Sequence, residues 1–112
     1  MLDKNNRLRK RKEFAYLYNN GTAKHTSHLT LVYIPTKFRA IKIGFSVTKK
    51  IGKAHIRNLV KRRLRAITRE IVSTLKDNFN VVIIAKVGID SVSFAEMKSQ
   101  VNYLFEKAGL KK

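Results

Sequence analysis

The clearest hydrophobic pattern in the chain is a stripe of apolar residues through its middle. Apolar residues spaced 4, 4, 3, 4 and 4 apart predict one buried face of a long helix from about Ile56 to Lys76. They are Ile56, Val60, Leu64, Ile67, Ile71 and Leu75. Just upstream, Ile41, Ile43, Phe45 and Val47 alternate with polar or small residues, which predicts a half-buried strand. Apolar runs at Leu29–Ile34 and Val81–Ala85 predict two further strands, and the second has the fully apolar composition of an internal strand.

Two shorter helices are predicted near the ends of the chain. In the first, from about Arg9 to Asn20, one face carries Phe14, Leu17 and Tyr18, and Gly21 follows as a C-terminal cap. The second begins at a capping box formed by Ser93 and Glu96 and ends near Gly109. Its apolar face comprises Phe94, Met97, Val101, Leu104 and Phe105. The element order is then α-β-β-α-β-α, so we expect a single α+β domain over residues 1–112, an α/β sandwich with one mixed sheet and three helices.

Composition narrows the setting of the protein. With 112 residues, of which 44% are hydrophobic, the chain can build one core. It has no Cys, which excludes disulfides and thiolate metal sites. No apolar run approaches the roughly 18 residues of a membrane span, and the basic segment Lys4–Lys12 is not followed by the apolar stretch of a secretory signal. We therefore expect a cytoplasmic protein without a membrane partner.

Charge is the unusual property of this sequence. Lys and Arg number 25 against 7 Asp and Glu, a net charge of +18, and no acidic residue occurs from Phe14 through Arg69. On the long helix, Asn58, Arg62, Arg65 and Arg69 project opposite the apolar stripe, with Lys61 beside them. Each like-charged pair four residues apart costs a helix roughly 0.2–0.5 kcal/mol. Solvated helix faces usually mix both signs, so this face indicates an external polyanion. Nucleic acid is favoured over a membrane, because the apolar face is needed for the core and because Arg and Asn offer directed donors.

A specific motif lies within this basic region. The residues are Ile51, Ala54, the pair Arg57-Asn58, the pair Lys61-Arg62, and Arg65, with two spacers between successive elements. This spacing resembles the signature of the bacterial ribonuclease P protein, and the preceding Gly44–Lys50 is similar to that family's strand and double-lysine lead-in. One departure is Leu59, where many members carry a basic residue. The resemblance implies a left-handed strand–helix–strand crossover and one further short strand, which the pattern does not locate.

The resemblance also implies two sets of binding residues. The ribonuclease P RNA subunit would be bound by Lys49, Lys50, Lys53, Arg57, Asn58, Lys61, Arg62 and Arg65. A cleft holding the 5′ leader of precursor tRNA would be formed by Phe14, Tyr18, Val32, Lys10 and Lys12. From the residues alone, core packing is the commoner role for aromatics spaced like Phe14 and Tyr18. Many family members carry an aromatic residue on the first strand; counting from Gly21, the resemblance matches that position to Val32, and Tyr33 would face the other side.

Catalytic chemistry within the chain is not expected. The seven acidic residues are scattered rather than clustered as in two-metal nucleases, and His25, His28 and His55 form no evident acid–base pair. No phosphate-binding loop motif surrounds Gly52-Lys53. We expect a non-catalytic protein component of an endoribonuclease, monomeric when bound, with no catalytic residue, metal site or cofactor of its own. The resemblance implies that the RNA subunit and its Mg²⁺ ions cut the precursor. Two alternatives stay open: a structural RNA-binding protein of ribosomal type, and an autonomous nuclease that uses the histidines.

Overall fold

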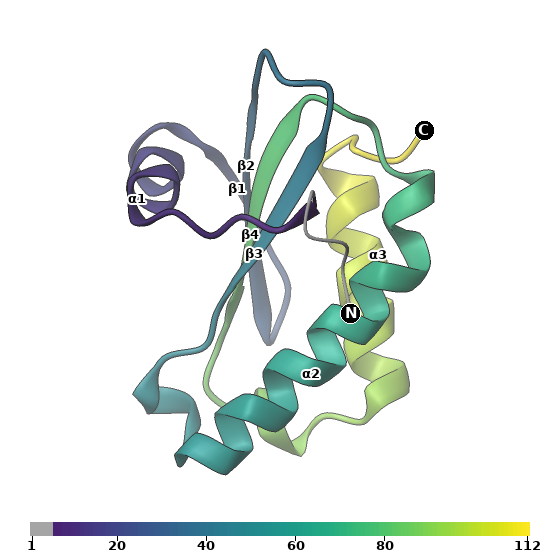
Figure 1. Ribbon diagram of the computed structural model, residues 1–112. Coiled ribbons are helices and arrows are strands. Elements are labelled where there is room, and N and C mark those ends of the chain that lie inside the picture. The colour runs from purple at the N-terminus through teal and green to yellow at the C-terminus, as the bar shows by residue number, and fades with distance from the viewer. Residues whose placement is uncertain (1–5) are drawn as a thin grey trace.

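The computed structural model describes residues 6–112, which form three helices and one four-stranded sheet (Figure 1). In chain order the elements are α1 (Arg11–Asn20), β1 (Thr22–His25), β2 (Leu29–Pro35), β3 (Ile41–Ser46), α2 (Ala54–Ile71), β4 (Phe79–Ala85) and α3 (Phe94–Lys107), with 3-10 turns η2 (Lys49–Ile51), η3 (Val72–Thr74) and η4 (Ile89–Ser91). The strand order is β1-β2-β4-β3; β3 runs parallel to β4, and the other pairs are antiparallel. The predicted α+β class, with one mixed sheet and three helices, is confirmed.

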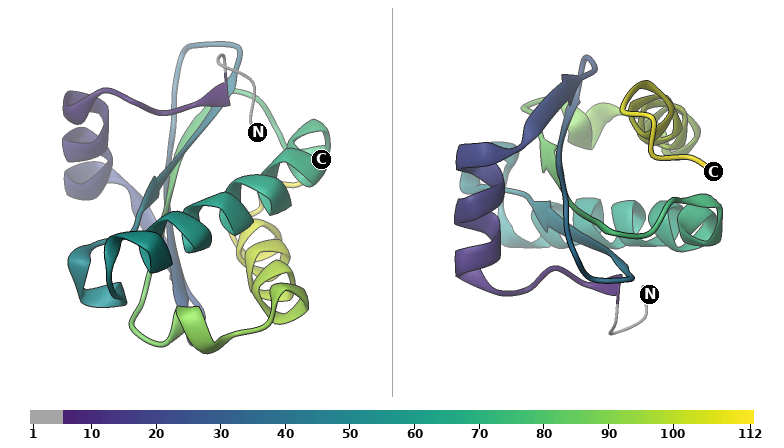
Figure 2. Two further views of the ribbon diagram at one scale, coloured as in Figure 1. Left: turned by 60° about the horizontal axis from the view of Figure 1, so that its bottom comes forward. Right: turned by 90° about the horizontal axis from the view of Figure 1, so that it is seen from above.

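The two faces of the sheet are covered unequally. Viewed from above, α1 lies on one side of the sheet, and α2 and α3 cover the other, with the N-terminal end of α2 reaching past the edge of the sheet (Figure 2). On the α2–α3 side, Leu31, Ile43 and Ile83 pack with helix residues such as Leu64 and Phe105 in a large core. On the α1 side, the fully or nearly buried residues are Leu8, Leu17, Val32 and Val82. The sequence therefore builds a closed core on one face and a small one on the other.

The strand absent from the sequence-based prediction is β1, so the element order is α-β-β-β-α-β-α. It pairs antiparallel with β2 at the edge of the sheet, from Thr22 opposite Tyr33 to His25 opposite Thr30. Its four residues are exposed or half-buried, so they carry no alternating apolar signal. This is a short strand of the kind that the family resemblance led us to expect.

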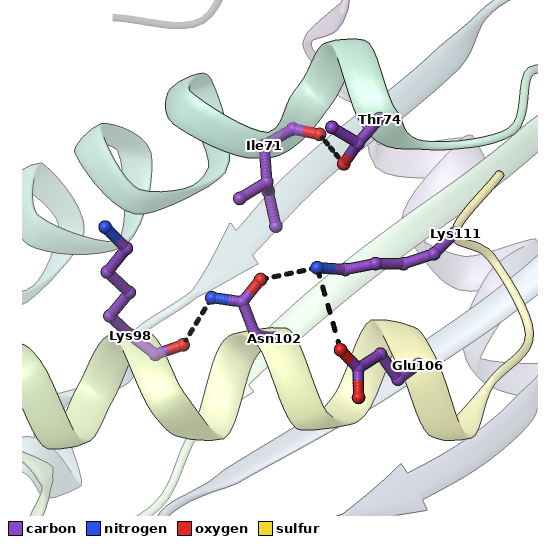
Figure 3. Close-up of polar contacts among 6 residues, drawn as sticks. All are labelled: Ile71, Thr74, Lys98, Asn102, Glu106 and Lys111. Carbon is purple, nitrogen blue, oxygen red and sulfur yellow. Dashed lines mark hydrogen bonds and ion pairs between the residues drawn. The ribbon is translucent and has the colours of Figure 1, made fainter.

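The prediction that the long helix extends to Lys76 is wrong, because α2 ends at Ile71. The C-terminal segment pairs with the residues beyond the helix: Leu75 bridges Lys111, and the amide of Lys76 donates to the carbonyl of Leu110 at 2.7 Å. The Lys111 ammonium donates to Asn102 Oδ1 at 2.6 Å and lies 4.0 Å from Glu106 (Figure 3). Leu75 is buried, as its spacing predicted, but it lies in an extended segment beyond the helix. The pairing with Lys111 holds that segment in place.

The C-terminal helix begins at Ser93 as predicted, with two corrections: the Glu96 carboxylate bonds Gln100 instead of completing the predicted capping box, and Phe94 lies outside the buried face. The Ser93 hydroxyl accepts the amide of Glu96 at 3.1 Å, while the Glu96 carboxylate accepts the side-chain amide of Gln100 at 3.3 Å. Phe94 was predicted to share the apolar face, but its side chain is 40% exposed. It occupies the first turn, and burial in the core begins at Met97. The other predicted residues of that face are fully buried.

Candidate RNA-binding site

The basic loop before α2 is anchored by one apolar side chain. Ile51 is buried at the end of η2, whereas Lys49, Lys50 and Lys53 are exposed around it. Gly52 has φ of 153°, in the region that L side chains rarely adopt, so a glycine allows the chain to turn here into the helix. The loop thus presents three ammonium groups from a fixed backbone.

The N-terminus of α2 adds to this positive potential. The N-cap residue Lys53 is extended and forms no side-chain cap hydrogen bond, and the first turn contains no acidic residue. The first amides of a helix lack intrahelical acceptors, and the helix dipole favours an anion there. Three lysines beside this helix end make it suitable for phosphate groups.

The exposed face of α2 carries the predicted polar residues. Asn58, Arg62 and Arg69 are exposed, whereas Val60 and Leu64 are buried in the large core. Within residues 6–112, none of the ion pairs involves a side chain between Lys49 and Arg69. The predicted division of this helix into an apolar and a basic face is confirmed, and its one acidic neighbour, Glu70, pairs with Lys98 rather than with these cations.

Arg57 is a special case on this helix. It is half-buried, and its Nε atom is enclosed without a hydrogen-bond acceptor among the described residues. A buried donor left without a partner costs about 1–3 kcal/mol, more for a charged group. An anionic ligand that reached this guanidinium would remove that cost.

A narrow cleft joins α2 to the α1 face of the sheet. It encloses about 170 Å³, and its lining residues are Arg7, Leu8, Arg9, Phe14, Ile43, Gly44, Phe45, Lys61 and Arg65. Phe14 lies directly against the backbone of β3, since a Cβ added at Gly44 would come 2.5 Å from Phe14 Cζ. The structure therefore brings Lys61 and Arg65, predicted to bind the RNA subunit, to the same cleft as the aromatic predicted to bind the leader.

The two aromatics of α1 differ in burial. Phe14 is half-buried and packs against the small core, with part of its ring lining the cleft. Tyr18 is 47% exposed, and its ring centroid lies 6.4 Å from that of Phe14 with the planes tilted by 39°. Together they form an aromatic surface along one side of α1, partly supported by the core and partly open.

The other predicted cleft residues take different positions. Val32 does face α1, with Tyr33 on the opposite side, but only 7% of Val32 is exposed, beneath the backbone of Gly21. Val32 therefore packs in the small core rather than lining the open cleft. Lys10 is exposed at the N-cap of α1 and lines a neighbouring hollow. Lys12 is exposed, and two residues along a helix place its side chain away from Phe14.

The histidines lie outside this region or at its margin. His25 Nδ1 is 3.0 Å from the Thr30 hydroxyl, and His28 Nδ1 is 3.1 Å from the amide nitrogen of Gln100. His55 is exposed in the first turn of α2. In the described part of the chain no group of three or more acidic or histidine side chains could hold a metal ion. None of the helices in that part is long and apolar enough to cross a bilayer.

The mixed sheet, the face of it that α1 only partly covers, and the basic outer face of α2 define an RNA-binding α+β protein. A family model described as Ribonuclease P matches residues 2–109. The Ribonuclease P protein component of Syntrophomonas wolfei is 36% identical over 110 residues, 98% of this chain and 92% of the relative. That of Finegoldia magna is 35% identical over 111 residues, 99% and 97% of the two chains. The chain belongs to the ribonuclease P protein component family.

A solved structure supports the fold. The RNase P protein of Staphylococcus aureus is 21% identical to this chain and superimposes on it with a TM-score of 0.90. The superposition covers 97% of this chain and 100% of the Staphylococcus aureus chain. Membership of the family implies an RNA partner and a place in tRNA processing.

Two features of the site were not identified from the sequence. Gly44 sits in the middle of β3, and the ring of Phe14 occupies the space that a side chain would need. An isolated glycine inside a strand pattern signals such a close approach, so this contact was open to prediction. The second feature is the hollow beside Lys10, which is built from segments far apart in the sequence and has no local signal.

Proposed function

We propose that this protein docks on the ribonuclease P RNA subunit through Lys49–Arg65 and holds the 5′ leader of precursor tRNA in the cleft beside Phe14. The protein acts in the cytoplasm as a monomer within the complex. The proposal combines membership of the family with the positions of the basic and aromatic residues.

The main support for the proposal is that two basic residues of α2 also line the cleft beside Phe14. Lys61 and Arg65 are half-buried and line the cleft with Phe14, while Asn58 and Arg62 on the same helix face outward. An RNA bound to the outer face of α2 would thus have the cleft at its edge. A single strand leaving that RNA could place a base on the aromatic surface and its phosphate beside the two cations.

The division of labour follows from the chemistry of the surface. Its described side chains are donors: ammonium groups, guanidinium groups and an amide suit the binding of phosphates. We assign the cutting of the precursor to the RNA subunit and its Mg²⁺ ions, and to this chain the positioning of the substrate. The ribosomal-type alternative would share the basic face, but it gives no role to a half-open aromatic cleft.

The deciding experiment compares precursor with mature tRNA, since only the precursor carries the leader. Phe14→Ala and Tyr18→Ala should each weaken precursor binding by the holoenzyme by about 1–3 kcal/mol, roughly 5- to 150-fold. Mature tRNA should bind almost as before. Tyr103→Ala removes an aromatic of similar exposure from α3 and serves as the matched control.

Thermal melts separate binding from folding in this experiment. Because Phe14 also touches the small core, its removal should lower stability somewhat, whereas removal of the exposed Tyr18 should not. Equal losses for both tRNAs with either variant would show that the aromatics serve only the fold, and the leader-binding proposal would be wrong.

A further inference from the structure

A second, larger hollow lies next to the cleft at the N-terminal end of α1. It encloses about 620 Å³ and is lined by Arg7, Arg9, Lys10, Glu13, Phe38, Arg39, Ala40 and Lys42. Arg7 and Arg9 line both spaces, so the two are neighbours along the α1 face of β3. The volume falls within the range of about 300–1,000 Å³ that is typical of small-ligand sites.

The aromatic in this hollow is held exposed. Phe38 is 71% exposed, more than any other large apolar side chain in the described part of the chain. Two hydrogen bonds from Asn78 fix the backbone around Phe38. The Asn78 side-chain amide donates to the Phe38 carbonyl at 2.7 Å, and the Asn78 backbone amide donates to the Ala40 carbonyl at 3.0 Å. Asn78 itself has a φ of 72°, a left-handed conformation that asparagine tolerates better than most residues. The tethered loop therefore holds an aromatic ring in solvent beside the cations that line the hollow.

The charges around Phe38 define the kind of partner. Five basic side chains line the hollow with a single carboxylate, Glu13. Lys42 Nζ lies 5.8 Å from the centroid of the Phe38 ring and 3.9 Å from Glu13, while Lys10 and Arg39 are exposed. A flat ring flanked by cations matches a nucleotide, whose base stacks on the ring and whose phosphate binds the cations.

We propose that Phe38, with Arg39 and Lys42, forms a second stacking site for one nucleotide of the precursor leader. The inference rests on the proposed function and extends it. Lys61 and Arg65 of α2 line the first cleft, whereas no residue of α2 lines the hollow at Phe38. The hollow is therefore farther from the helix that docks on the RNA subunit, and it takes a nucleotide on the 5′ side of those at Phe14.

The test measures holoenzyme affinity for precursors whose leaders are lengthened one nucleotide at a time. Phe38→Ala should weaken the binding of long leaders by about 5- to 20-fold and leave short leaders unchanged. Phe14→Ala should already weaken the binding of precursors that have short leaders. Phe38→Tyr keeps the stacking ring and should bind as the wild type does, and Tyr103→Ala is again the control for loss of an exposed aromatic.

The outcomes distinguish this site from the proposed function. If wild-type affinity does not depend on leader length, the protein does not bind the leader, and both proposals are wrong. If Phe14→Ala shows its leader effect but Phe38→Ala matches the wild type at every length, only the second site is wrong, and a protein partner is the better explanation of Phe38. An equal loss from Phe38→Ala at all lengths would also overturn the proposed position.

Discussion

The same strands form both faces of the sheet, but helices cover one face completely and the other only in part. Toward α2 and α3, the alternate residues of β2, β3 and β4 enter a core closed by two helices. Toward α1, β3 presents Lys42 and Gly44, and one short helix covers only part of the surface. Because stability comes mainly from the closed face, the half-covered face can keep part of an aromatic ring and several cations in contact with solvent.

The largest expected effect tests the closed face. Phe105 is fully buried between α3 and the sheet. Phe105→Ala should cost about 3–5 kcal/mol of unfolding free energy, measured by urea denaturation, because it removes a large side chain from a core that cannot fully collapse. A loss below about 1 kcal/mol would mean that this face does not dominate stability.

The next largest effect concerns the outer face of α2. Arg62→Gln with Arg69→Gln should weaken binding to the RNA subunit, and the slope of log K against log salt should flatten by about 0.7–0.9 for each phosphate that the protein no longer neutralises. Melting temperature should stay constant or rise slightly, since like-charge repulsion on the helix is relieved. Lys76→Gln with Lys107→Gln removes the same number of exposed positive charges outside the site and is the matched control. If both changes gave the same slope, the Arg62 face would be only a solvated surface.

A smaller effect is expected from closing the cleft without removing its aromatic. In Gly44→Ala the new methyl group would displace the Phe14 ring, whose tip is the nearest atom. Precursor affinity should fall by about 5- to 10-fold, at the lower end of the effect of losing one base–aromatic stack. Stability should change less than in Phe105→Ala, because the displaced atom is the far end of a side chain that can rotate. Unaltered precursor affinity, with mature tRNA as the reference, would show that the position of the ring against β3 does not matter.

The smallest effect is predicted for the histidines. The variant with His25, His28 and His55 all changed to Ala should keep most of the cleavage activity of the holoenzyme at saturating protein. Its stability should fall by about 1 kcal/mol, because the hydrogen bond between His28 and Gln100 is removed. Loss of cleavage with RNA binding intact would favour the autonomous nuclease instead.

Local periodicity was sufficient to predict much of the fold. The stripe from Val60 to Ile71 predicted the buried face of α2, the alternation from Ile41 to Phe45 predicted β3, and Ser93 marked the start of α3. These features depend on residues a few positions apart. The end of α2 could not be found in this way, because Leu75 keeps the helical spacing while pairing with Lys111 in the C-terminal segment.

The candidate site also combines features that local spacing predicts with features that depend on tertiary packing. The outward direction of Asn58 and Arg62 follows from helical spacing alone. The meeting of Phe14 with Gly44 and Lys61 depends on how three elements pack, and only the resemblance to a family indicated that such a cleft exists. Burial of Val32 beneath Gly21 is equally a matter of packing.

The strand order has a consequence for how the chain folds as it is synthesised. β4 is the last strand in the sequence, yet it lies between β2 and β3, which do not pair with each other. Until Phe79–Ala85 has left the ribosome, β3 has no neighbouring strand and β2 has only β1, so the apolar stripe of α2 has no completed sheet to cover. At about 5–20 residues per second the newly made chain spends seconds in this state. During that time the positive charge from Phe14 through Arg69, which no acidic residue interrupts, opposes association between unfinished copies.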